Sequence, residues 1–181
     1  MEEMKRHKEF EIPFSGLKQG RHHFEYQIDQ TFFEAFAYDE FRASSVKVEA
    51  TLDKMSTTME MQIAVSGHVN LLCDISGEPF DQPLTGDLEL VIKFGDAFND
   101  EDDEILILPH GAHEFNIAQY VYELVVLSVP TKRVHPGVED GSLESEALKK
   151  LKELHPKEGR ESSEETDPRW DALRDLLTDK K

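Results

Sequence analysis

Hydrophobic and polar residues alternate along much of the first 95 residues, which is the pattern of β-strands with one buried face. The alternating runs are residues 22–28, 46–52, 59–65, 69–71 and 88–94. Short polar turns, such as residues 53–57, separate most of them. We therefore expect consecutive antiparallel strands that form a meander.

Two further segments are expected to be extended. Residues 10–14 are apolar and contain Pro13, so they predict an edge strand or extended arm that ends in a Ser15-Gly16 turn. Residues 105–108 are continuously apolar, and Val91 also breaks strict alternation. These positions predict strands that are covered on both faces or lie at the end of a closing sheet.

Two helices are predicted to pack on this sheet. Asp29 is placed to cap a short helix through residues 31–37, whose aromatic side chains Phe32, Phe33 and Phe36 we assign to the core. Asn116 is placed to cap a helix over residues 117–129 that ends at Pro130. A buried strand is the alternative for that second segment. The predicted buried face of the helix consists of Ile117, Tyr120, Val121, Leu124 and Leu127 or Ser128.

Beyond Pro130 the sequence becomes charged and helical, so we divide the chain into a β-rich domain, 1–135, and a tail, 136–181. Ser142 is placed to cap a helix, and residues 155–166 predict a mobile linker. Residues 167–178 predict a terminal amphipathic helix that begins at Asp167-Pro168 and is too short to be stable alone. Its apolar residues Trp170, Leu173 and Leu177 either dock on the chain's own body or enter a groove of a partner.

The fold class that follows is α+β and mainly antiparallel. We expect a meander forming an open sheet or partial barrel, one or two packed helices, and a helical, partly mobile C-terminal tail. The oligomeric state does not follow from the sequence.

Negative charge is concentrated in the β-rich part. Residues 1–130 contain 9 Lys and Arg against 25 Asp and Glu, a balance of −16 of the total −18. Residues 74–104 alone contain 11 acidic residues and one lysine, Lys93. Such a surface repels phosphate and attracts basic polypeptides. The candidate partner-binding residues are Asp96, Asp100, Glu101, Asp102, Asp103 and Glu104, together with Trp170, Leu173 and Leu177. The alternative is that these acids only maintain solubility.

Catalysis and metal binding receive little support. The one cysteine, Cys73, lies in a turn between strands, where zinc sites often place a Cys-x-x-Cys pair, but Ser76 occupies the second position. A thiol or metal enzyme would have to use Cys73 with His68, His110 and His113. We expect the acidic surroundings to raise the pKa of the thiol, and we assign the two later histidines to a surface turn. We expect no metal, because the cysteine pair is broken and the acidic run at residues 99–104 lacks the spacing of a calcium loop. We expect no catalytic residue and no cofactor, because no Gly-x-Ser-x-Gly elbow, phosphate loop or dinucleotide fingerprint occurs.

The N-terminus is charged and no long apolar run occurs, so the sequence predicts a cytoplasmic protein that does not bind membranes. Direct RNA binding remains an alternative through the basic residues Lys132, Arg133, Lys149, Lys150 and Lys152.

The order of four features resembles the YceD family of large ribosomal RNA subunit accumulation proteins. They are the strand-turn-strand unit around Cys73, the acidic segment before residues 104–108, residues 116–130, and the tail motif at residues 167–173. The turn departs from the Cys-x-x-Cys of many members through Ser76.

This resemblance implies a role in large-subunit biogenesis and accumulation of 23S ribosomal RNA. With the charge distribution, it predicts a noncatalytic factor that binds a basic ribosomal protein or assembly factor.

Overall fold

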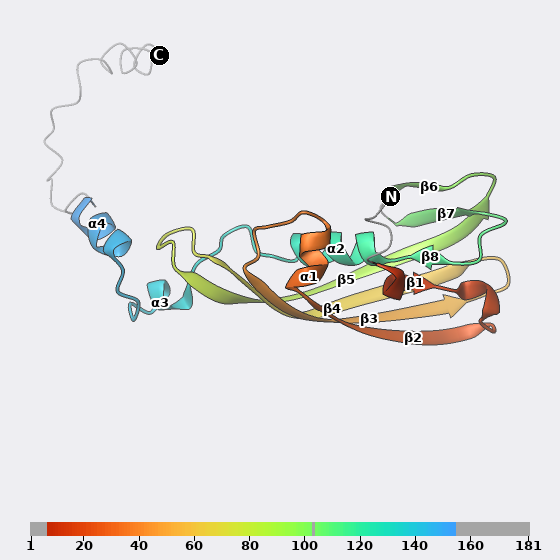
Figure 1. The fold of residues 1–181 in the computed structure, drawn as a ribbon, viewed down its shortest axis with the longest axis horizontal. Helices are drawn as coiled ribbons and strands as arrows, with labels where there is room; N and C mark the ends of the chain where they lie inside the picture. The colour runs from red at the N-terminus through yellow and green to blue at the C-terminus, as the bar shows by residue number, and fades with distance from the viewer. Residues whose placement is uncertain (1–6, 103, 155–181) are drawn as a thin grey trace, which may run out of the picture. The chain divides into compact units, whose positions relative to one another are not determined.

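The computed structural model describes residues 7–102 and 104–154 (Figure 1). Contacts divide the chain into two units, residues 1–143 and 144–181, and each is considered by itself. The strands of the first unit are β1 (Glu11–Ile12), β2 (Gly20–Asp29), β3 (Ala43–Lys54), β4 (Met59–Leu72), β5 (Pro79–Gly95), β6 (Asn99–Asp102), β7 (Ile105–Pro109) and β8 (Phe115–Asn116). Its helices are η2 (Lys8–Phe10), η3 (Phe14–Gly16), α1 (Gln30–Ala35), α2 (Ala118–Leu127) and α3 (Pro136–Glu139). None of the described helices is long and apolar enough to cross a membrane.

A six-stranded open sheet in the order β2-β3-β4-β5-β7-β6 is the centre of the first unit. The first four strands are neighbours in sequence and pair antiparallel, which confirms the predicted meander. Strand β7 instead pairs in parallel with β5, because the chain passes outward to β6 and returns between β5 and β6. The α+β open sheet predicted from the sequence is thus confirmed, with one parallel pair that the pattern did not predict.

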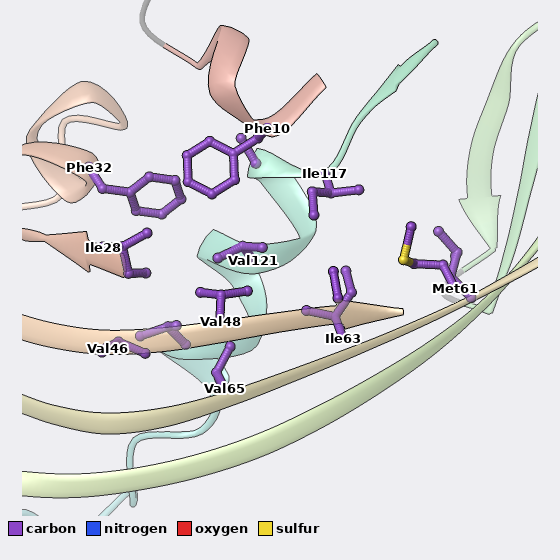
Figure 2. Close-up of a cluster of buried hydrophobic side chains, with 14 of the residues drawn as sticks. Phe10, Ile28, Phe32, Val46, Val48, Met61, Ile63, Val65, Ile117 and Val121 are labelled. Carbon is purple, nitrogen blue, oxygen red and sulfur yellow. The ribbon is translucent and has the colours of Figure 1, made fainter. Parts of the chain in front are cut away.

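One face of the sheet is covered by the N-terminal segment, α1 and α2. Figure 2 shows Phe10, Phe32 and Val121 above the inward side chains of β3 and β4, among them Val46 and Ile63. All five are buried, and their neighbours along the strands point to the opposite, polar face. The alternation read from the sequence therefore correctly identified the buried face of these strands.

Strand β4 is longer than predicted, because the runs at 59–65 and 69–71 belong to one strand that continues through Gly67. Gly67 pairs with Val46 of β3, and its φ of 158° is one that residues with a side chain rarely adopt. A Cβ at this position would lie 2.2 Å from the carbonyl oxygen of Ser45 and 2.7 Å from Cα of Val46. Glycine therefore lets the two backbones approach closely in mid-strand.

Both predicted helices of the first unit form, so the alternative of a buried strand over residues 117–129 is wrong. The carboxylate of Asp29 accepts a hydrogen bond from the N–H of Thr31 at 2.9 Å, as a helix cap does. The amide oxygen of Asn116 accepts from the N–H of Ala118 at 2.8 Å, but the N-cap of α2 is Ile117, one residue later than predicted.

The buried stripe of α2 differs from the predicted one. Ile117, Ala118, Val121 and Val125 are buried, whereas Leu127 is 82% exposed. Tyr120 and Leu124 are only half-buried. The prediction left the last position open between Leu127 and Ser128: Leu127 is wrong because it borders a groove, whereas Leu124 and Ser128 lie against Gly86 of β5.

The N-terminal arm is partly as expected. Residues 11–12 form the short strand β1, which pairs with β8, and residues 14–16 form a 3-10 turn.

Residues 105–108 lie in β7, where Leu106 and Leu108 are buried and Ile105 and Ile107 are half-buried. Both faces of β7 are thus apolar, as its continuous hydrophobic run predicted, although the sheet does not close.

The described part of the second unit contains α4 (Glu146–Leu154). Ser145 Oγ accepts the N–H of Leu148 at 3.2 Å, so Ser145 caps this helix. The prediction that Ser142 caps it is wrong, because the helix begins only at Glu146, four residues after Ser142. The predicted linker 155–166 and helix 167–178 lie outside the described residues, and the domains 1–135 and 136–181 stay a prediction.

Candidate protein-binding site

The acidic residues selected from the sequence lie at one margin of the sheet. Asp96 is in the turn after β5, Asp100, Glu101 and Asp102 are in the outermost strand β6, and Glu104 precedes β7 (Figure 1). All five are exposed. We call these five residues the acidic edge. Asp103 lies outside the described residues.

Within residues 7–102 and 104–154, no Lys, Arg or His forms an ion pair with a carboxylate of the acidic edge. The ion pairs found among the described residues involve Glu25, Glu40, Glu49, Asp53, Asp74 and Glu144, none of which belongs to the acidic edge. The polar contacts at the edge are local: Asn99 Oδ1 accepts from the N–H of Glu101, and Asp102 Oδ1 from the N–H of Glu104, both at 3.0 Å. The negative charge of this strand therefore remains available to a basic partner.

A groove adjoins the acidic edge, bounded by β5, β6–β7, β8 and α2. Its volume is about 940 Å³. Asp100 and Asp102 line one wall, and Glu123 and Leu127 of α2 line another. The sequence pattern assigned Tyr120, Leu124 and Leu127 or Ser128 to the face packed on the sheet and did not indicate Phe98, although all five line this groove. The sequence did contain one indication of the groove: the apolar face of the helix is wider than the face that can pack on the sheet.

Tyr120 lies between acidic residues of opposite walls of the groove. Burial, with the charges of Asp100 and Glu123, raises the pKa of its phenol to about 12. The phenol therefore stays protonated over the physiological range and can donate a hydrogen bond to an occupant of the groove.

Cys73 is buried, as expected, in the turn between β4 and β5. Burial disfavours the thiolate, but Sγ receives N–H groups from His135 at 3.3 Å and from Ser76 at 3.4 Å. These donors prevail and lower the pKa of the thiol from its ordinary value of 9.0 to about 7. The expectation that acidic surroundings raise this pKa is therefore wrong, because backbone donors and not carboxylates surround the sulfur.

The proposed thiol enzyme constellation does not assemble. His68 is exposed on the polar face of β4, while Cys73 is buried. His110 and His113 lie in the loop between β7 and β8, where the carbonyl of His113 accepts the N–H of Ser15 at 3.1 Å. Among residues 7–102 and 104–154, no three His, Cys, Asp or Glu side chains gather as a metal site requires.

Arg133, one of the residues considered for RNA binding, is engaged within the protein. Its guanidinium lies 2.9 Å from Glu40 and 3.4 Å from Asp74, and the hydrogen bond to Glu40 helps to raise its pKa. The backbone N–H of Arg133 also donates to the carboxylate of Asp74 at 2.9 Å. Lys132, Lys149, Lys150 and Lys152 are exposed. Arg133 thus fastens the segment after α2 to the Cys73 turn and has little charge to offer phosphate. The predicted contact residues Trp170, Leu173 and Leu177 lie outside the described residues.

Comparison with known proteins gives one match. No curated protein and no solved structure matches the chain. The family described as "Large ribosomal RNA subunit accumulation protein YceD" matches residues 61–177, well over half of the 181 residues. The match includes the Cys73 turn, the acidic edge and α2. The chain therefore belongs to the YceD family.

Proposed function

We propose that this protein is a noncatalytic factor of large ribosomal subunit biogenesis that supports the accumulation of 23S ribosomal RNA by binding a basic ribosomal protein or assembly factor. The family name supports the connection with ribosomal RNA accumulation. The observation that carries the mechanism is the acidic edge, whose exposed carboxylates have no ion-pair partner among the described residues.

The electrostatics favour a protein over RNA as the direct partner. An RNA-binding surface gains affinity when Lys and Arg replace counterions on phosphates, and the first 130 residues contain only 9 such side chains against 25 acidic ones. Ribosomal RNA would be affected indirectly, because RNA that is not assembled with its proteins is degraded.

The competing explanation of the acidic edge is protection of an edge strand. Charged residues on an outermost strand prevent pairing with other chains, and β6 is such a strand. Protection alone does not require an apolar groove beside the charges, and the groove at this margin favours a binding role.

Affinity purification of the tagged full-length protein after nuclease treatment tests the proposal. The variant D96N/D100N/E101Q/D102N/E104Q removes five charges from the acidic edge. The matched control E9Q/E34Q/D39N/E60Q/E78Q removes five charges at exposed positions elsewhere.

We expect basic ribosomal proteins or assembly factors to be recovered with the wild type and the control, and to be reduced at least tenfold with the edge variant. Recovery that disappears on nuclease treatment of the wild type would contradict the proposal in favour of RNA binding. Equal recovery by both variants would assign the acidic edge to solubility.

A further inference from the structure

The groove beside the acidic edge is an uncovered part of the protein's apolar interior. Leu88 of β5 and Leu106 and Leu108 of β7 line it from the sheet, and Leu124 lines it from α2. Leu106 and Leu108 are buried, while Leu88 and Leu124 are half-buried and pack against the core. Over β2–β4 the same face is covered by α1, α2 and the N-terminal segment, so the groove is where this cover ends.

Two exposed apolar side chains stand at the walls of the groove. Phe98, before β6, is 58% exposed, and Leu127, at the end of α2, is 82% exposed. Both line the groove from different elements. The other large hydrophobic side chains exposed in the described part of the first unit, Met55 and Leu72, do not line it. Apolar anchors on either side of an apolar floor are typical of peptide-binding grooves.

The charges around this apolar floor are all of one sign. Asp87, Asp100, Asp102, Glu114 and Glu123 line the groove, and no Lys or Arg is found among its described lining residues. An occupant must therefore combine apolar side chains with positive charge. Neither end of this chain complements the acidic walls, because residues 155–181 have 8 acidic and 6 basic residues and residues 1–6 have 2 of each.

Strand β5 also offers backbone groups at the groove. Its ladder with β7 covers Val91–Gly95 only, so in the described structure residues 79–90 of β5 pair with β4 on one side and with no strand on the other. The N–H of Val91 and the carbonyl of Gly95 point toward the β7 side, so the backbone groups of Asp87, four residues before Val91 and part of the groove lining, point the same way. Free strand edges are common binding sites for peptide segments.

We propose that this groove is the docking site for a basic segment of a partner protein, whose apolar side chains enter between Phe98 and Leu127 and whose Lys and Arg side chains contact the acidic walls. This inference rests on the proposed function and assigns it to a defined surface.

The test uses the full-length protein and a fluorescein-labelled synthetic peptide in which leucine and lysine alternate, so that the leucines lie on one face of an extended strand. A peptide of the same composition with scattered leucines tests for attraction by charge alone. The groove variant is F98A/L127A and its matched control is M55A/L72A; all four side chains are exposed, so neither variant removes a buried contact. Fluorescence polarisation near physiological salt gives the dissociation constants, and thermal melts verify that both variants fold.

We expect the first peptide to bind the wild type and the control equally, and to bind the groove variant at least tenfold more weakly. Equal affinity for the groove variant, equal binding of the two peptides or no binding to the wild type would each overturn the proposal. A tenfold gain of affinity in W170A/L173A would overturn it as well, because the chain's own tail would then be the occupant.

The nuclease-treated purification distinguishes this inference from the proposed function. Recovery of basic ribosomal proteins by F98A/L127A at the wild-type level would overturn the groove as the docking site and leave the function intact. Absence of such proteins with the wild type would overturn the function itself.

Discussion

Substitution of Gly67 by alanine tests how the sheet that carries the binding surface is held together. The new Cβ would lie 2.2 Å from the Ser45 carbonyl oxygen and 2.7 Å from Cα of Val46, where ordinary contacts are 3.4–4 Å. Both obstructing atoms belong to the backbone of β3, so no side chain can rotate away to make room. The strands β3 and β4 must separate at the pair of Val46 and Gly67.

The cost of this separation follows from what it disrupts. Two neighbouring ladder hydrogen bonds lengthen, at about 1 kcal/mol each. The packing of Val46 and Val65, which are 0% and 3% exposed, loosens at a cost of roughly 1–2 kcal/mol. Alanine restricts the unfolded chain more than glycine does, and this raises the free energy of unfolding by at most about 1 kcal/mol. The expected net loss is therefore about 2–3 kcal/mol.

The assay is thermal unfolding followed by far-ultraviolet circular dichroism. For a chain of this size, about 1 kcal/mol corresponds to roughly 2–4 °C, so Gly67→Ala should lower the Tm by roughly 4–12 °C. Gly111→Ala is the matched control, because a Cβ there has no atom within 4 Å, and its Tm should stay near that of the wild type. A Tm of Gly67→Ala within about 2 °C of the wild type would refute the close approach of the two strands.

Two further predictions concern the turn and the caps. Because the folded pKa of Cys73 is lowered from 9.0 to about 7, the unfolded chain binds the proton more tightly, and the stability that the thiolate contributes should grow as the pH rises from about 7 to 9. The difference in unfolding free energy between wild type and Cys73→Ala, measured in urea, should widen over that range; a constant difference would argue against the two N–H donors at Sγ. Asp29→Ala should lower the free energy of unfolding by about 1 kcal/mol because the N–H of Thr31 loses its cap, whereas Asp39→Ala, with no such contact, should be nearly neutral; equal effects in urea unfolding would count against the cap.

The meander was predictable because its information is local. Alternation such as that of Val46, Val48, Ala50 and Leu52 arises from the two-residue period of a strand and needs no knowledge of the partner. The cap at Asp29 was predictable for the same reason, since its side chain bonds to a backbone group two residues away, and the start of α2 was predicted to within one residue. The parallel pairing of β7 with β5 was not, because it depends on where a short strand inserts after a turn.

The candidate site, too, was predictable from the sequence only in part. The acidic edge is visible as a run of acids, but the groove beside it requires β5, β7, β8 and α2 to be placed together. Leu124 and Leu127 have helical spacing that suits burial equally well, so their place in the groove could not be predicted from periodicity. The contact of His135 with Cys73 could likewise not be predicted, because the two residues are 62 positions apart in sequence.

The most direct test of the account is the level of 23S ribosomal RNA in cells that lack the protein and express a variant. The edge variant D96N/D100N/E101Q/D102N/E104Q keeps the fold of the sheet, since all five side chains are exposed, and removes the charge that we assign to partner binding. We predict that it leaves 23S ribosomal RNA depleted, while the control E9Q/E34Q/D39N/E60Q/E78Q, expressed at the same level, restores it. Full restoration by the edge variant would contradict the account.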